Sequence, residues 1–228
     1  MIAGTSLRME EIAAQVSPAS VVADIGTDHG IIPALLLESG RAKYVIATDI
    51  SEPSLDKART LFRMRRLSEK TDCRAGDGLL VLRPYEADCL IISGMGGLLI
   101  AAIIEQGMRV AKSAHSLILQ PNTAQPELRE FLFTKGFVAE KEILCEEHGK
   151  FYEIIVASWG KPRVLRDHYL VSPLWEKNDV YHRYMAQKKL RAMTALQGLL
   201  SAKEPDEEKI AAARAQYDFY AASAGSET

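Results

Sequence analysis

One ten-residue segment constrains the fold of this chain more than any other. Residues 21–30, VVADIGTDHG, read as a short buried strand that runs into a glycine turn, and the apolar residues 31–37 follow as a helix. In an open α/β sheet, a strand, turn and helix in this order build a ligand site at the carboxyl end of the first strand. The segment therefore predicts a nucleotide-type ligand site at this turn.

The acidic residues of the turn indicate which ligand it takes. A dinucleotide-binding turn reads Gly-x-Gly-x-x-Gly, and its second glycine lets the backbone approach a pyrophosphate. Asp28 holds that position here, and Asp24 precedes it by four residues. Carboxylates repel phosphate and attract cations, and S-adenosylmethionine carries a sulfonium and an ammonium group but no phosphate. We therefore expect a methyl-donor site that comprises Asp24, Gly26, Thr27, Asp28, His29 and Gly30.

Strand-like and helix-like segments alternate along the chain. Strands are predicted at residues 20–25, 44–49, 71–75, 87–93, 115–120, 137–145 and 151–158, and helices at 6–16, 31–39, 52–66, 97–112 and 125–135. This alternation predicts a parallel sheet covered on both faces. Residues 146–150 are too few for a crossover helix, so the last two strands should pair antiparallel. The predicted fold is α/β: a Rossmann-like, seven-stranded, mostly parallel sheet with an antiparallel hairpin, as in class I S-adenosylmethionine-dependent methyltransferases.

The character of the chain changes after residue 160. From residue 173 onward it is rich in Ala, Lys, Leu, Met, Gln and Glu, and Pro205 is expected to start a second helix. Apolar residues recur there at helical spacing, namely Leu190, Met193, Leu196, Leu199 and Leu200. We predict a Rossmann-like domain at 1–160 and, at 161–228, a linker with a helical hairpin that frays after residue 221. Such apolar helix faces can also pair, which leaves a monomer and a weak dimer both open.

Composition indicates the class of protein and the compartment in which it works. The 228 residues, 47% hydrophobic and 25% charged, are typical of a soluble globular protein. The sequence contains neither an apolar run of the roughly 20 residues that span a bilayer nor the pattern of a secretory signal. Cys73, Cys89 and Cys145 are widely spaced and fit neither a disulfide framework nor a zinc site. We expect a cytoplasmic protein without membrane contact and without a metal.

Two further acids follow predicted strands. Asp49 ends the second strand, where an acid in such folds holds ribose hydroxyls, and Ile50 adjoins it. The alternative is a helix N-cap, a role that Ser51 could also fill. Asp77, followed by Gly78, lies after the third strand and can accept a hydrogen bond from an adenine amino group. An Asp-Gly pair is also a common turn.

Residues 93–97, SGMGG, follow the fourth strand, where this fold places the group that accepts the methyl. Ser93, Gly94 and Met95 are therefore expected at the donor site, and the glycines leave room for a large substrate. The alternative is that they only permit close packing of a helix on the strand. Gln120 and Asn122 end the fifth strand, where their amides could read the edge of a base. Asn122 could instead cap the next helix.

These motifs occur together in one known family. DIGTDHG, SGMGG, LQPN and GKFYEI, in this order over residues 5–160, resemble the bacterial tRNA adenine-22 N1-methyltransferases, the TrmK family. The last helices resemble the small coiled-coil domain of that family. One departure is Ile31, where many members are expected to have a tyrosine. The resemblance implies transfer of a methyl group from S-adenosylmethionine to N1 of adenine 22 in the D-arm region of tRNA.

The resemblance also implies roles for individual residues. Asp28, Asn122 and Gln120 are the expected catalytic residues, and Asp28 is expected to stabilise the positive charge that develops on the methylated ring. N1 lies on the Watson–Crick edge, so the base must first turn out of its pair. Basic clusters are expected to hold the tRNA backbone. Those expected to do so are the arginines of 59–66 and the basic residues of 183–191. The sequence has three basic clusters in all: Lys57, Arg59, Arg63, Arg65, Arg66, Lys70 and Arg74, then Lys161, Arg163 and Arg166, and finally Arg183, Lys188, Lys189 and Arg191.

Two other functions compete with this interpretation. The first is a methyltransferase for another RNA or for a small metabolite. A methyltransferase for a small metabolite would need a closed pocket. The second is a non-catalytic RNA-binding module that has kept the fold but no longer binds the methyl donor. The intact acids Asp24, Asp49 and Asp77 argue against the second.

Overall fold

The computed structural model describes residues 5–18, 20–160, 169–202 and 206–224. It divides into two compact units, Met1–Leu174 and Trp175–Thr228. Of the linker predicted at 161–172, residues 161–168 with their basic side chains lie outside the described residues. The two units are therefore treated one at a time.

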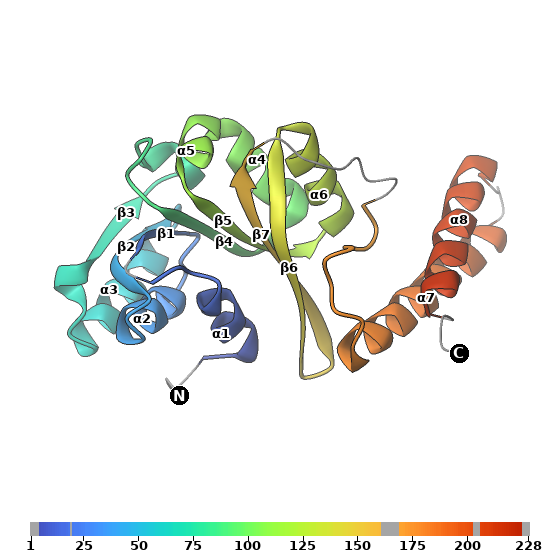
Figure 1. Ribbon diagram of the computed structural model, residues 1–228, viewed down its shortest axis with the longest axis horizontal. Helices are drawn as coiled ribbons and strands as arrows, with labels where there is room; N and C mark the ends of the chain where they lie inside the picture. The colour runs from blue at the N-terminus through green and yellow to red at the C-terminus, as the bar shows by residue number, and fades with distance from the viewer. Residues whose placement is uncertain (1–4, 19, 161–168, 203–205, 225–228) are drawn as a thin grey trace. The chain divides into compact units, whose positions relative to one another are not determined.

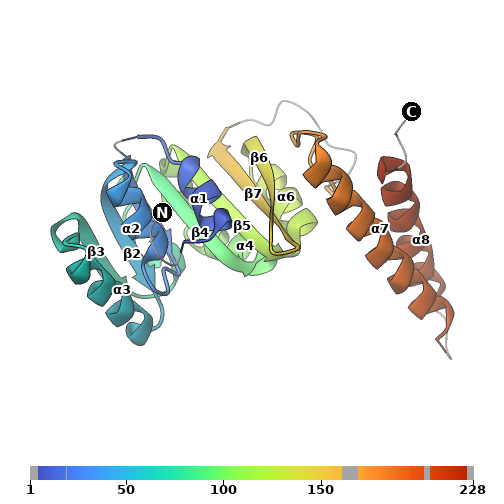
Figure 2. The same cartoon turned by 90° about the horizontal axis from the view of Figure 1, so that it is seen from below.

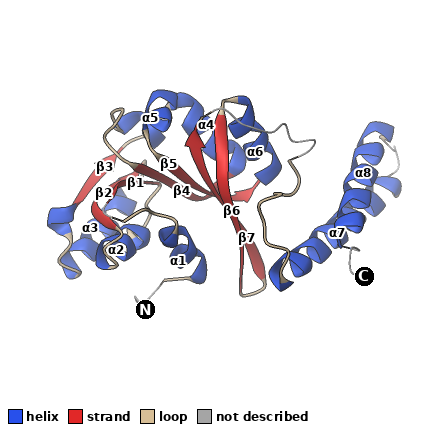
Figure 3. Cartoon of the chain, viewed as in Figure 1, coloured by secondary structure: helices blue, strands red, loops and turns tan. Residues whose placement is uncertain are grey.

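Within the described residues, seven strands of the first unit form one sheet in the order β3-β2-β1-β4-β5-β7-β6 (Figure 3). The strands are β1 Ser20–Ile25, β2 Ala42–Asp49, β3 Thr71–Ala75, β4 Cys89–Gly96, β5 Ser116–Thr123, β6 Phe137–Glu147 and β7 Lys150–Trp159. Strands β1 to β5 pair parallel, whereas β7 runs antiparallel to both β5 and β6. This arrangement confirms the predicted fold class.

Helices cover both faces of the sheet (Figures 1 and 2). On one face lie α1 Leu7–Ala14, α2 Ile31–Glu38 and α3 Glu52–Met64, and on the other α4 Gly97–Gln106, α5 Met108–Ser113 and α6 Gln125–Thr134. Each layer buries its own apolar cluster, the first around Ile12, Leu36 and Phe62 and the second around Ile100 and Phe137. Burial of apolar surface on both faces explains why the central strands are continuous hydrophobic runs.

Some boundaries differ from the sequence-based expectation. Strand β4 extends through Gly96 because it continues to pair with β5 up to Thr123, with shifts in register on the way. The predicted helix at 97–112 is interrupted at Gly107, where a Cβ would lie 2.3 Å from the Cβ of Leu79. A side chain larger than that of glycine would therefore not fit at the break between the two helices.

The antiparallel hairpin of β6 and β7 turns at His148 and Gly149, with φ of 49° and 73°. Glu147 and Lys150 are partners in the register on either side. Positive φ at both central residues is the signature of the tight turn that matches the twist of a hairpin. The turn is shorter than the predicted 146–150 because both strands extend beyond their predicted ends.

A buried ionic cluster lies between α6 and the hairpin. Arg129 pairs with Glu142 at 2.7 Å and also with Glu153, and these three side chains are almost completely buried. Arg129 also donates a hydrogen bond to the carbonyl of Tyr169 at 3.4 Å. The segment that ends the first unit is thus bound to the sheet domain by a charged side chain.

The second unit pairs α7 Asp179–Leu200 with α8 Glu207–Ala224. Asn178 caps α7 by accepting a hydrogen bond from the Tyr181 amide at 3.1 Å. The helix predicted from the spacing of apolar residues is present, and two residues of that pattern, Leu190 and Leu200, are 58% and 51% exposed. The buried residues of α7 are Tyr181, Tyr184, Met185 and Ala192.

Pro205 and residues 225–228 lie outside the described residues. Within the described ranges, every helix is too short or too polar to cross a membrane.

Candidate active site

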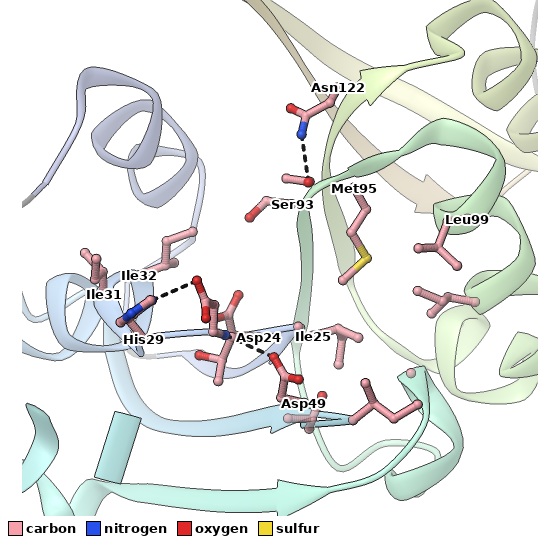
Figure 4. Close-up of a pocket in the computed structure, with 18 of the residues that line it drawn as sticks. Asp24, Ile25, His29, Ile31, Ile32, Asp49, Ser93, Met95, Leu99 and Asn122 are labelled. Atoms are coloured by element: carbon pink, nitrogen blue, oxygen red, sulfur yellow. Dashed lines mark hydrogen bonds and ion pairs between the residues drawn. The ribbon is translucent and has the colours of Figure 1, made fainter. Parts of the chain in front are cut away.

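A pocket of about 580 Å³ lies where the first four strands of the sheet end (Figure 4). Thirteen of the predicted site residues line it: Asp24, Gly26, Thr27, Asp28, His29, Asp49, Ile50, Asp77, Gly78, Ser93, Gly94, Met95 and Asn122. Gly30 and Gln120 lie behind the lining. The sequence interpretation did not assign Arg8, Met9, Ile25, Ile31, Ile32, Thr48, Gly76, Leu99 and Ile103, which also line the pocket.

The turn after β1 is built by backbone contacts. The amides of Gly26 and Thr27 donate to the carbonyl of Thr48 at 2.8 and 2.9 Å, which joins the ends of β1 and β2. Gly26 has a φ of 74°, and a Cβ there would lie 2.2 Å from Cε of Met95. The positive φ favours a glycine at this position, and the terminal methyl of Met95 packs directly against it.

Gly30 serves packing, because its φ is 73° and a Cβ would meet Phe62 Cζ at 2.8 Å. This glycine lets the start of α2 lie directly on α3. The glycines of the motif thus act in two places, one at the pocket and one behind it.

Asp24 is the buried acid of the pocket, with 3% of its surface exposed. Burial raises the pKa of Asp24 to about 6, and the negative charge of Asp49 acts in the same direction. At neutral pH the site therefore holds an ionised carboxylate at an energetic cost. A cation bound beside it would reduce this cost.

Asp49 connects two loops at the pocket. Its Oδ1 accepts from the Ser51 amide at 2.8 Å, and its Oδ2 accepts from the Asp28 amide at 3.2 Å. Ser51 is the N-cap of α3, accepting from the Ser54 amide at 3.4 Å. Ser51, and not Asp49, therefore caps α3, and Asp49 lines the pocket. Ile50 beside it is 78% exposed, which leaves an apolar surface there.

Asp28 and His29 form a pair at the rim of the pocket. Asp28 Oδ2 lies 2.7 Å from His29 Nδ1, and the two side chains are 64% and 50% exposed respectively (Figure 4). Asp28 has a φ of 48°, a left-handed conformation that aspartate tolerates better than most residues. Its carboxylate is more exposed to solvent than that of Asp24.

Amide side chains and Arg8 form a network on the acceptor side of the pocket. Gln120 Oε1 accepts from Arg8 Nη1 at 2.5 Å and from the Gly94 amide at 3.2 Å. Gln120 Nε2 donates to Asn122 Oδ1 at 3.0 Å, and Asn122 Nδ2 donates to the Gly94 carbonyl at 2.7 Å. Gln120 is fully buried, so it orients its neighbours from behind the wall of the pocket.

The structure excludes the helix-capping role that was one alternative for Asn122. Residue Ala124, with a φ of 54°, holds the N-cap position of α6. The Asn122 side chain bonds to Gly94 instead (Figure 4). Asn122 therefore supports the pocket wall and does not cap the helix.

The basic residues of 57–74 are not equivalent. Arg59 pairs with Glu52 and Asp56, Arg65 with Glu38, and Arg74 with Asp72 and Glu86. Among the described residues, by contrast, Lys57, Arg63, Arg66 and Lys70 have no ion-pair partner. The charge available to a polyanion is therefore smaller than the sequence suggests. His, Cys, Asp and Glu side chains nowhere gather in groups of three suited to a metal within the described part of the chain.

The strand order and the acid-rich pocket at the carboxyl ends of the first strands define a Rossmann-like methyltransferase domain. The methyltransferase-domain family matches residues 5–155. The tRNA (adenine(22)-N(1))-methyltransferase of Bacillus subtilis is 32% identical over 90% of this chain and 89% of its own length. The chain therefore belongs to the methyltransferase family that includes this tRNA (adenine(22)-N(1))-methyltransferase.

Solved structures agree with this assignment. The crystal structure of the B. subtilis m1A22 tRNA methyltransferase TrmK has a TM-score of 0.87 at 29% identity, covering 96% of this chain and 98% of that one. A candidate tRNA (m1A22) methyltransferase of Streptococcus pneumoniae, in complex with S-adenosyl-L-methionine, has a TM-score of 0.81 at 31% identity. That match covers 93% of this chain and 99% of the other. The similarity thus extends over both units of the chain.

Proposed function

We propose that this protein transfers a methyl group from S-adenosylmethionine to N1 of adenine 22 in tRNA. The observation that carries the proposal is the convergence of Asp24, Asp28, Asp49 and Asp77 on one pocket at the carboxyl ends of the strands. Four acids suit a ligand with positive charge and hydroxyl groups, and they disfavour a phosphate-bearing coenzyme. The names of the relatives support the substrate and the position. On this proposal the protein works in the cytoplasm, with tRNA as its partner.

The pocket residues fit the donor. Asp49 would hold the ribose hydroxyls, Asp77 the adenine amino group, and the exposed apolar side chain of Ile50 the face of a flat ring. The buried carboxylate of Asp24 would face the positively charged methionine end. When bound, the donor supplies a methyl group activated by a positively charged sulfur.

The protein groups on the acceptor side act by positioning. The lone pair of adenine N1 is a free nucleophile near neutral pH, so orientation rather than proton removal supplies the acceleration. Asn122 and Gly94 form the wall against which the base would lie, and buried Gln120 keeps Asn122 in place. We assign Gln120 a positioning role and Asn122 a substrate contact.

A labelling experiment tests the proposed function. Unmodified tRNA would be incubated with tritiated S-adenosylmethionine, and the labelled nucleoside would be identified and mapped. We expect N1-methyladenosine at position 22, with no label in a tRNA that carries guanosine there. Free adenosine should be a far poorer substrate. Label at another position, or equal rates on adenosine, would contradict the proposal.

Replacement of Asp28 by alanine should lower turnover about tenfold and leave tRNA affinity within about twofold. The reason is that its carboxylate would stabilise charge appearing on the ring only as the methyl group moves. The exposure of Asp28 moderates the expected effect. Single-turnover kinetics measures the rate of methyl transfer, and filter binding measures the affinity for tRNA. Equal losses in rate and affinity would contradict the role assigned to Asp28.

Replacement of Asp24 by asparagine should stabilise the free protein at neutral pH and weaken donor binding. The pKa of Asp24 is raised from 3.8 to about 6 in the folded chain. Between these values the folded state binds more protons than the unfolded state. The free energy of unfolding of the wild-type protein therefore falls as pH rises through this window, and the full penalty remains above it.

The shift corresponds to about 3 kcal/mol, which is the upper limit of the expected gain for Asp24→Asn at about pH 7.5. Urea unfolding at several pH values measures it. At about pH 4 the two proteins should be nearly equal, which provides an internal control. A variant no more stable than wild type at about pH 7.5 would contradict the expectation.

A further inference from the structure

The side chains on the acceptor side of the pocket form a chain of hydrogen bonds with a fixed direction. It begins at two groups that can only donate, the guanidinium of Arg8 and the backbone amide of Gly94. Both donate to Gln120 Oε1, at 2.5 and 3.2 Å respectively. The chain ends at a group that can only accept, the carbonyl of Gly94, to which Asn122 Nδ2 donates at 2.7 Å. The direction of the chain is thus set at both ends.

These fixed ends determine how the two side-chain amides are turned. A half turn of an amide side chain exchanges the places of its oxygen and its nitrogen. Because Gln120 Oε1 must accept, its Nε2 must donate, and it donates to Asn122 Oδ1 at 3.0 Å. The opposite orientation of either amide would place two donors or two acceptors against each other. Gln120 is fully buried, so water does not compensate for such a mismatch.

Asn122 keeps part of its hydrogen-bonding capacity for a ligand. A side-chain amide has two N–H donors and an oxygen with two lone pairs. Among the described residues, Asn122 uses one donor toward Gly94 and one lone pair toward Gln120. One donor and one acceptor therefore remain on a side chain that is exposed and lines the pocket (Figure 4).

We infer that Asn122 binds the Hoogsteen edge of the target adenine, accepting a hydrogen bond from N6 and donating one to N7. This inference rests on the proposed function. An asparagine amide pairs with N6 and N7 of adenine through one acceptor and one donor, which is the capacity that remains here. Binding at this edge leaves N1, on the Watson–Crick edge, without a protein partner. The lone pair of N1 is then available to attack the methyl group.

The same orientation selects adenine over other purines. Guanine and hypoxanthine have an acceptor, O6, where adenine has its amino group. That oxygen would lie against Asn122 Oδ1, and the direction of the chain keeps the amide from turning to donate instead. Arg8 and Gln120 thus act as positioning residues for base selection, through Asn122 and without touching the base.

Replacement of one ring atom in the substrate tests the contact. A tRNA with 7-deazaadenosine at position 22 lacks the N7 acceptor but keeps N1 and N6. Single-turnover rates of the wild-type protein at subsaturating tRNA should be about tenfold lower on this tRNA than on the unsubstituted one. Asn122→Ala should methylate both tRNAs slowly, at rates within about twofold of each other.

Gln120→Glu tests the positioning role, because it keeps the shape of the side chain but offers only acceptors when ionised beside Arg8. It should turn the Asn122 amide, so that the preference for adenosine over 7-deazaadenosine falls to within about twofold. Slower methylation with the full preference retained would overturn the positioning role of Gln120.

Gln125→Ala is the matched control. Gln125 Nε2 also donates to Asn122, at its backbone carbonyl at 3.3 Å, from outside the pocket lining. This variant should keep the preference of about tenfold. Equal rates of the wild-type protein on the two tRNAs, or a full preference in Asn122→Ala, would overturn the inference and leave the proposed function intact. Failure of the wild-type protein to methylate adenosine 22 would instead overturn the proposed function.

Discussion

Replacement of Asp49 by alanine is expected to weaken binding of S-adenosylmethionine about 100-fold. Asp49 would accept hydrogen bonds from the ribose hydroxyls, and hydrogen bonds to a charged group contribute about 1.5–3 kcal/mol each. The substitution also removes the acceptor for the Ser51 and Asp28 amides, which shape the two loops at the pocket. Titration calorimetry with the donor measures the change.

The effect of Asp49 on ribose can be separated from its effect on the loops. A 2′-deoxy analogue of the donor should bind wild type more weakly than the donor itself, and Asp49→Ala should discriminate much less between them. Asp88→Ala is the matched control, because Asp88 also accepts from a backbone amide, that of Val21 at 2.8 Å, at the amino end of the sheet. If Asp49→Ala preferred the donor over its 2′-deoxy analogue as strongly as wild type does, Asp49 would not contact the ribose.

Replacement of Gly97 by alanine is expected to destabilise the methyltransferase unit by about 3 kcal/mol and to reduce methyl transfer more than 100-fold, on the order of the costs of overpacking a core. A Cβ at Gly97 would lie 2.2 Å from the carbonyl oxygen of Ala124 and 2.9 Å from that of Thr123. These are backbone atoms, so the connection between β5 and α6 must move. Asn122 is the next-to-last residue of β5, immediately before this connection, and would move with it.

Urea unfolding and initial rates on tRNA measure the two effects. Gly198→Ala is the matched control, because a Cβ at that helical position meets no atom within 4 Å among the described residues. It should be neutral or slightly stabilising, since alanine is favoured over glycine inside a helix. A Gly97→Ala protein with wild-type stability would show that the connection is not tightly packed.

The local sequence was sufficient to predict the acidic residues at the carboxyl ends of the strands. Asp24 lies near the end of β1, Asp49 ends β2 and Asp77 follows β3, and parallel strands bring their carboxyl ends to one edge. Sequence could not place Arg8, because its partner Gln120 is 112 residues away and the contact depends on how α1 meets the hairpin. The amphipathic pattern of 6–16 predicts a helix but not which residue of it reaches the pocket.

Contacts between distant segments also explain two other features that the sequence did not predict, the bounds of the helices and the buried position of Gln120. A pattern of apolar residues predicts a helix over 97–112 but does not show that the helix is interrupted at Gly107, where Leu79 packs closely. Similarly, alternation along β5 does not reveal that Gln120 lies behind the pocket wall while Asn122 lines it. The spacing of apolar residues on α7 predicted a helix, but it did not show that the buried residues would be Tyr181, Tyr184, Met185 and Ala192.

The bond from Arg129 to the Tyr169 carbonyl determines where the two units can be separated. A chain shortened at residue 160 would take away an acceptor of a nearly buried guanidinium and also Val171 and Ser172, which are buried. Severing the polypeptide after Leu174 would keep all of these in the sheet domain. The boundary of the first unit, at Leu174, thus lies fifteen residues beyond Trp159, the end of the last strand.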